Sequence, residues 1–303
     1  MKEPPGTAPF DCYIAVDWSG ARGTNNRSIV VARLEGGANR VDLVSPPSPR
    51  GWSRSSVMSW LIDQASKGQR TLVGFDFSFS GPFLDEGSYF PGCELGGKSA
   101  PELWDAFRNL AEREPANQAG AIVDPGTIVR HPVLSPFFLT AKGRGGQFSR
   151  RFRATEIACR TGGYGAAESL FHLVGPSQVG LGSIAGMAEL GTLACSPDVF
   201  IWPFGGLAPP FEPKLVVVEI FCRLWLLKAG MGRKKIRTID DLNRALSAFD
   251  CVWSGDHPVD DHTTDAAVSV AALSQCAQEQ ALWSPLGLSA DIARTEGWTF
   301  GVP

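Results

Sequence analysis

The chain has 303 residues, of which 44% are hydrophobic and 19% charged, so it can build a sizeable core and is not broadly disordered. Lysine and arginine number 28 against 31 aspartate and glutamate, and the resulting net charge of −3 excludes a histone-like polycation. No apolar run approaches the roughly 18 residues of a membrane-spanning helix, and the start lacks a signal-peptide pattern. We therefore expect a cytoplasmic protein without a membrane partner, whose seven cysteines are buried thiols.

The first part of the chain predicts four strands and one helix. Apolar runs rich in β-formers indicate strands over 11–19, 27–34 and 40–44, and the short loops between them favour an antiparallel meander. A helix over 53–67 then leads to a strand over 71–79. A strand, helix, strand step of this size predicts that the strand over 71–79 lies parallel to the first.

The middle of the chain is less regular. Residues 81–196 predict helices only over 101–112 and 182–194, with many glycines and prolines between them, which indicates an insertion or subdomain. Strands over 199–204 and 214–221 and helices over 239–249 and 263–281 follow. We therefore predict an α/β core made of residues 10–80 and 197–303, with 81–196 inserted into it.

Three of the most apolar strands each carry one acid near the carboxyl end: Asp17, Asp76 and Glu219. A lone carboxylate in such a strand costs several kcal/mol to desolvate, so the three call for a shared explanation. If the strands are neighbours in one parallel sheet, the acids converge at its carboxyl edge, where α/β proteins usually bind ligands.

The last long helix brings further acids. Asp261 and Asp265 are four residues apart and share a helix face, and the small residues after Asp265 allow the helix to approach the sheet. Clustered carboxylates repel unless cations neutralise them, and Mg²⁺ or Mn²⁺ prefer oxygen ligands. One or two such ions would activate water against a phosphodiester.

Each acid also has a purely structural interpretation. Asp17 can begin a turn, Asp76 can pair with a buried arginine, and Glu219 can lie on an exposed strand edge. One aspartate at 260–261 can be the helix N-cap, and Asp265 can interact with the helix dipole. The four acids together favour the metal site more than any one does.

The order strand with acid, meander, helix, strand with acid, insertion, strand with acid and final helix resembles the ribonuclease H-like superfold. More narrowly, the chain resembles the predicted ribonuclease H-like nucleases called domain of unknown function 429. The resemblance extends from about residue 12 to residue 302 and rests on five segments: YIAVDWSGA, VGFDFSFSGP, VVVEIF, DHTTDAAVSVAAL and EGWTFGVP. It implies metal ligands at Asp17, Asp76 and Asp265, with Glu219 or Asp261 as the additional carboxylate. The chain departs from the family pattern at EIFCRLW, where a proline is expected.

A basic segment supplies candidate phosphate contacts. Six cations lie between residues 142 and 160, and we select Arg144, Arg150, Arg151 and Arg153 as substrate-binding residues. A solvated loop is the alternative interpretation of this segment. His257 and His262 flank the terminal acids and are candidates for proton transfer.

The sequence thus predicts a metal-dependent nuclease or phosphodiesterase whose partner is nucleic acid or another phosphodiester. Two alternatives stay open. One is an ATP-dependent phosphotransferase of the sugar-kinase type, which shares the superfold but whose Gly-rich second hairpin is missing here. The other is a catalytically silent nucleic-acid-binding module that keeps the acids as scaffolding. The sequence leaves the substrate, the number of metal ions and the oligomeric state open.

Overall fold

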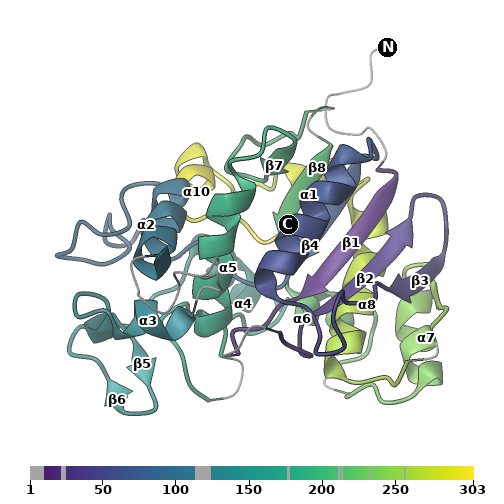
Figure 1. The fold of residues 1–303 in the computed structure, drawn as a ribbon, viewed down its shortest axis with the longest axis horizontal. Helices are drawn as coiled ribbons and strands as arrows, with labels where there is room; N and C mark the ends of the chain where they lie inside the picture. The colour runs from purple at the N-terminus through teal and green to yellow at the C-terminus, as the bar shows by residue number, and fades with distance from the viewer. Residues whose placement is uncertain are drawn as a thin grey trace.

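The computed structural model describes residues 10–303 except 22–24, 113–123, 176–177, 211, 213, 233 and 256. Within these residues a mixed sheet of seven strands has the order β7-β8-β4-β1-β2-β3-β9 (Figure 1). A separate two-stranded sheet pairs β5 with β6. The strands are β1 (Cys12–Asp17), β2 (Val30–Glu35), β3 (Arg40–Leu43), β4 (Thr71–Phe75), β5 (Leu139–Thr140), β6 (Gly143–Arg144), β7 (Val199–Ile201), β8 (Leu215–Glu219) and β9 (Val252–Trp253). With helices against both sides of the large sheet, the fold is of the predicted α/β class.

The strand pairings confirm the predicted meander and crossover. β1 pairs antiparallel with β2, and β2 pairs antiparallel with β3. β4 runs parallel to β1 on its other side, β8 runs parallel to β4, and β7 runs parallel to β8. β9, which pairs with β3, was not predicted, because two residues are too short for a recognisable alternation.

The central strands are shorter than predicted, and this places the acids. β4 ends at Phe75, so Asp76 is the first residue beyond the strand rather than a member of it. Asp17 is the last residue of β1 and Glu219 is the last residue of β8. The register aligns Val16 with Phe75 and Phe75 with Glu219, so the three acids lie at one edge of the sheet.

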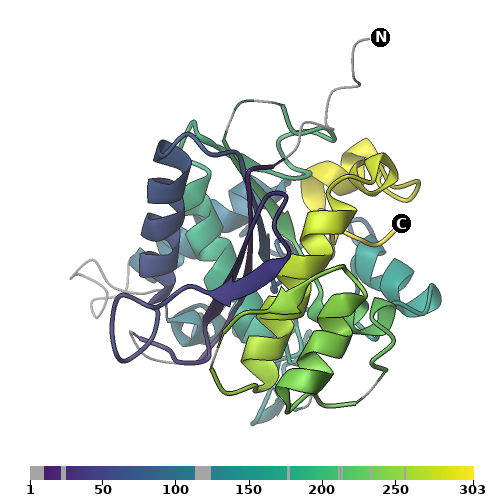
Figure 2. The same ribbon diagram turned by 90° about the vertical axis from the view of Figure 1, so that its right-hand side faces the viewer.

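Helices cover both faces of the sheet (Figure 2). α1 (Arg54–Ser66) and α5 (Gly180–Leu193) lie on one face, and α6 (Cys222–Lys228), α7 (Ile239–Ser247) and α8 (Asp261–Cys276) lie on the other. The side chains of β1 alternate between two hydrophobic clusters, Ile14 and Val16 facing α1, and Tyr13 and Ala15 facing α8. The predicted helix over 263–281 is in fact α8 followed by the short α9 (Gln280–Trp283).

Small residues let α8 lie close to the sheet. Ala267 and Ala271 are fully buried, and a Cβ on Gly74 of β4 would lie 2.8 Å from Leu273 Cδ1. Asp260 caps the helix, since its side chain accepts a hydrogen bond from the backbone of Thr263. Of the two aspartates at 260–261, Asp260 is therefore the helix N-cap that the structural interpretation predicted.

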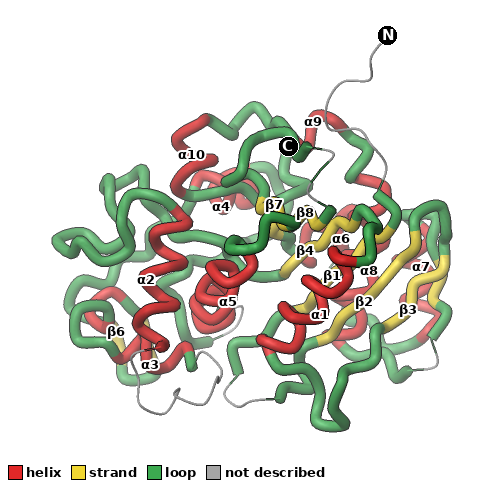
Figure 3. The backbone as a smooth tube through the Cα atoms, turned by 45° about the horizontal axis from the view of Figure 1, so that its top comes forward, coloured by secondary structure: helices red, strands yellow, loops and turns green. Residues whose placement is uncertain are grey.

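The segment expected to be an insertion is rich in loops (Figure 3). Its side chains, including Phe90, Trp104 and Ile184, nevertheless belong to the hydrophobic cluster that also contains Leu61 of α1, so they share a core with that face of the sheet. The segment carries α2 (Ala100–Glu112), α3 (Pro125–Arg130), a 3₁₀ turn (Ser135–Phe137), α4 (Ala154–Thr161) and α5, and α10 (Ala290–Thr295) lies near the end of the chain. In the described part of the chain, no helix has the length and apolarity needed to span a membrane.

Candidate metal centre

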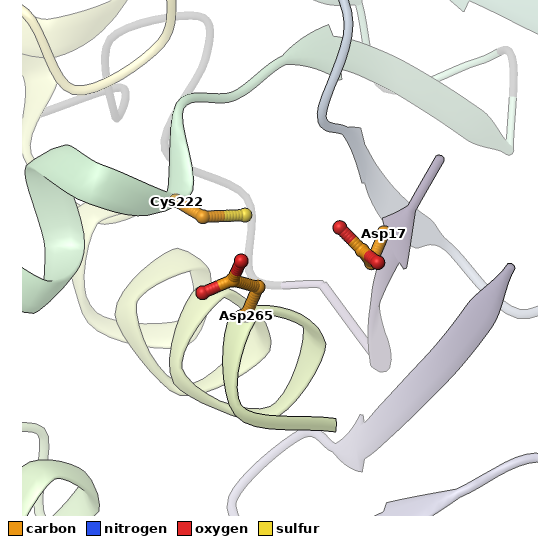
Figure 4. A group of neighbouring side chains, drawn as sticks. All are labelled: Asp17, Cys222 and Asp265. Atoms are coloured by element: carbon orange, nitrogen blue, oxygen red, sulfur yellow. The ribbon is translucent and has the colours of Figure 1, made fainter. Parts of the chain in front are cut away.

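Asp17 and Asp265 lie together although they are far apart in the sequence. Asp17 ends β1, and Asp265 lies one turn into α8, which packs against that strand. Cys222, the first residue of α6, joins them (Figure 4). One ligand atom from each of the three side chains lies within 4.8 Å of those of the other two. The predicted convergence of a strand acid with Asp265 is confirmed.

Two members of the group, Cys222 and Asp265, line a cleft of about 1130 Å³ at the carboxyl edge of the sheet. Asp76, Cys222, His262 and Asp265 line it on one side. Gly163, Gly165 and residues at the start of α5 form other parts of its wall. The volume exceeds that of most small-ligand pockets, so the cleft has room for a substrate beside the acids.

Burial and mutual repulsion raise the pKa of all three aspartates at this edge. Burial raises the pKa of Asp17 to about 6, against a lowering hydrogen bond to His262. Burial and the charge of Asp17 raise the pKa of Asp76 to about 7, while burial and the charge of Asp76 raise that of Asp265 to about 7. A bound divalent cation would favour the ionised forms, because an opposite charge offsets both burial and repulsion.

Cys222 is a member of the group that the sequence pattern did not single out. Its thiol is buried and accepts a hydrogen bond from Ser269 Oγ at 3.1 Å. Hydrogen bonding from the side chain and backbone of Cys222 lowers the pKa of Asp76 against the larger effect of burial. Burial, and then the charges of Asp76 and Asp265, raise the pKa of this thiol well above its ordinary value. The thiol therefore stays protonated at neutral pH. The only sequence signal was its place three residues after Glu219, in EIFCRLW.

The donor set suits a hard divalent cation. Carboxylate oxygens, as in Asp17 and Asp265, are the ligands that Mg²⁺ and Mn²⁺ use in proteins. Asp76 lies outside this group of ligand atoms, but it lines the cleft at the same edge of the sheet and is a further candidate oxygen donor. In the metal-free protein the raised pKa keeps the Cys222 thiol protonated, and hydrogen bonding from this residue lowers the pKa of Asp76 against the larger effect of burial. The residues present therefore fit the expected Mg²⁺ or Mn²⁺, and the geometry itself establishes a carboxylate and cysteine group able to hold a metal ion.

The two candidate histidines lie in different surroundings. His262 lies in the first turn of α8 and its Nδ1 is 2.6 Å from Asp17 Oδ2. His257 is exposed in the loop before α8 and does not line the cleft. The hydrogen bond to the Asp17 carboxylate raises the pKa of His262. Of the two, the structure brings only His262 to the acids.

Glu219 lies at the predicted edge, but its carboxylate is fully engaged by protein donors. Oε1 accepts from Arg153 Nη2 at 2.6 Å and from Thr299 Oγ1 at 2.7 Å. Oε2 accepts from the backbone N–H of Phe79 at 2.7 Å and from Arg153 Nη1 at 2.8 Å. A carboxylate has about four lone-pair sites, and here all are used. The prediction of Glu219 as a catalytic residue is therefore not supported, because protein donors already occupy its oxygens.

Asp261, the other candidate for the additional carboxylate, pairs with basic side chains at the surface. It is exposed and forms ion pairs with Arg237 at 2.6 Å and with Lys235 at 3.1 Å. Hydrogen bonding to Arg237 lowers the pKa of Asp261 to about 2. As the first residue of α8, it lies outside the group formed by Asp17, Cys222 and Asp265. The prediction of Asp261 as a metal ligand is not supported, because its charge is already neutralised at the surface.

The basic segment does not form one surface. Arg151 is buried and pairs with Asp85, and Arg153 is only 1% exposed. Arg150 is half exposed but pairs with Glu168. Arg144 alone of the four selected arginines lies exposed without an ion pair among the described residues, in the β5–β6 hairpin. The sequence could not separate them, because burial of an arginine depends on acids brought from distant segments.

A different arginine lines the cleft beside the acids. Arg223 follows Cys222 in α6 and is partly buried, and its charge lowers the pKa of Asp265 against the larger effect of burial. Within the described residues no ion pair or hydrogen bond engages its guanidinium, whereas Arg160, also on the cleft wall, donates to the carbonyl of Ala167. Arg223 therefore presents an uncommitted positive charge next to Asp265.

Comparison of the chain with protein-family models, with curated proteins and with solved structures finds no match. The geometry of the cleft is thus what bears on function.

Proposed function

We propose that the chain is a ribonuclease H-like, metal-dependent phosphodiesterase or nuclease. The observation that carries the proposal is the convergence of Asp17 and Asp265 within one group of ligand atoms at the edge where Asp76 also lies. An antiparallel meander followed by parallel strands is the arrangement on which the resemblance to that superfold rests. The raised pKa values of the three aspartates mark them as groups whose ionisation a ligand would favour.

Asp17, Asp76 and Asp265 would hold one or more Mg²⁺ or Mn²⁺ ions. When bound, such an ion lowers the pKa of a coordinated water and stabilises negative charge on a phosphate ester. His262 keeps the Asp17 carboxylate oriented and ionised through its 2.6 Å contact. The Cys222 side chain and backbone do the same for Asp76.

The substrate is proposed to be an anion that enters the cleft. Arg223 places an uncommitted guanidinium on the wall near Asp265, and guanidinium groups bind phosphate oxygens through two parallel hydrogen bonds. The exposed Arg144 lies on the separate β5–β6 hairpin and would add a contact only for a long substrate such as a nucleic acid. A phosphodiester is thus the proposed substrate class.

Cleavage assays with matched variants test the proposal. The full chain is incubated with labelled RNA, DNA and RNA–DNA hybrid, in Mn²⁺, in Mg²⁺ and in EDTA. We expect metal-dependent cleavage that falls more than about a hundredfold in Asp17→Asn and in Asp265→Asn. Asp261→Asn is the control, since this exposed acid lies on the same helix but outside the group. Cleavage that survives in Asp17→Asn, or is absent from the wild type with all substrates, would count against the proposal.

A further inference from the structure

Among the described residues, Arg153 is the cation that pairs with Glu219, an acid that neighbours Asp76 at the sheet edge. Phe75 and Glu219 are neighbours in register, and Asp76 follows Phe75. Arg153 precedes α4, in the segment between β4 and β7, and both it and Glu219 line the cleft. The guanidinium meets the carboxylate end-on as a bidentate pair, with both of its Nη atoms donating.

Arg153 is held from several directions. Its Nε donates to Glu156 Oε1 at 2.9 Å, and its Nη1 also donates to the carbonyl of Glu296 at 3.0 Å. It is 1% exposed, and Glu156 and Glu219 are buried with it. A guanidinium does not lose its proton under ordinary conditions, so a permanent positive charge is fixed at Glu219.

The hydrogen bonds leave no place for a metal ion on Glu219. Both of its oxygens accept two hydrogen bonds each, from Arg153, Thr299 and the backbone of Phe79. A cation bound there would have to displace a buried donor and would meet the guanidinium charge. Two ions about 3.5 to 4 Å apart would need oxygen ligands at both positions, and Glu219 has no lone pair left to offer to the second.

Resting on the proposed function, we infer that the centre holds a single divalent ion per chain, and that Arg153 supplies at Glu219 the positive charge that a second ion would otherwise supply. Asp17, Asp265 and Asp76 are left to bind that ion. Arg153 is in this sense a positioning residue. It neutralises Glu219 and thereby confines the metal ion to the three aspartates.

Counting bound ions tests the inference. Mn²⁺ is titrated into the EDTA-treated, dialysed full chain, and free Mn²⁺ is measured by electron paramagnetic resonance up to millimolar concentrations. We expect saturation at one ion per chain, and loss of that ion in Asp265→Asn. Saturation at two ions would overturn the inference while leaving the proposed function intact. No binding would overturn the metal site of the proposed function and the inference together.

Two variants test the role of Arg153. Arg153→Met frees the Glu219 carboxylate, and we expect a second Mn²⁺ to bind. Because an unpaired buried carboxylate can prevent folding, the paired variant Arg153→Met with Glu219→Gln is made as well, and thermal unfolding verifies that it folds. We expect this variant to bind one ion with an affinity within about threefold of wild type. A loss of more than about tenfold in affinity would make Glu219 a ligand and overturn the inference.

Discussion

His262 and Asp17 are 245 positions apart in the chain, and His262 Nδ1 lies 2.6 Å from Asp17 Oδ2. The contact joins the end of β1 to the first turn of α8. It partly offsets the burial that raises the pKa of Asp17. The imidazole thus helps to keep a candidate metal ligand ionised.

Replacing His262 should therefore weaken metal binding in a pH-dependent way. In His262→Ala the pKa of Asp17 rises further, so protons compete more strongly with Mn²⁺ near pH 6.5, with about a tenfold loss of affinity for each unit of rise. Affinity should recover towards wild type at pH 8.5. Calorimetric titration at both pH values measures this, with His257→Ala as the control because that histidine is exposed. An equal loss at both pH values would contradict the explanation.

The stability of the metal-free protein should fall as pH rises from about 4 to about 7. Asp17, Asp76 and Asp265 have folded-state pKa values of about 6, 7 and 7. Unfolded aspartates titrate near pH 4. The native state therefore binds more protons in this window, and the free energy of unfolding decreases with pH, by an amount on the order of a few kcal/mol.

Urea unfolding in EDTA across this pH range measures the effect. Asp265→Asn should show a shallower fall, because one of the three titrating groups has been removed. Mn²⁺ competes with the same protons, so its stabilisation of the wild type should be larger at pH 8 than at pH 5. Stability that increases with pH in EDTA, with no difference between wild type and Asp265→Asn, would show that these carboxyls do not titrate as argued.

Cys222 should act as a hydrogen-bond donor and not as a metal ligand. Its thiol stays protonated beside Asp76 because its pKa is raised well above the ordinary value. Cys222→Ala should therefore weaken Mn²⁺ binding near pH 7 by about tenfold, the range found for outer-shell partners, and Cys222→Ser should restore most of it. Cd²⁺ added at neutral pH should give no thiolate charge-transfer absorption. A strong absorption band that disappears in Cys222→Ser would make the sulfur a ligand instead.

Arg223 should contribute to substrate binding and not to metal binding. Its guanidinium lines the cleft near Asp265, and within the described residues it has no protein partner. Arg223→Ala should raise KM for a cleaved phosphodiester by roughly 10- to 100-fold, since a hydrogen bond to a charged group contributes about 1.5–3 kcal/mol. The Mn²⁺ affinity should change less than threefold. Lys228→Ala, at the exposed end of the same helix, is the matched control, and a wild-type KM in Arg223→Ala would remove the arginine from the substrate site.

The sequence alone was sufficient for the order of the main elements and for the ends of the central strands to within a few residues. Alternating or continuous apolar runs are local properties, so they predicted β1, β2, β4 and β8 and the parallel crossover that brings Asp17 near Asp76. The alanine-rich stretch after Asp265 likewise predicted a helix that approaches the sheet. These features depend on periodicity and on residue size, which each segment carries by itself.

Only the tertiary structure decided which charges are free. Glu219 and Asp265 are both candidate site carboxylates in the sequence, but Arg153 pairs with Glu219, whereas Asp265 joins the group of ligand atoms with Asp17. Similarly, Cys222 and Arg223 attracted no attention as single residues, yet α6 begins where β8 delivers the chain to the acids. Whether a buried charge is neutralised depends on side chains from distant segments at distances of a few ångströms, and no local pattern encodes those distances.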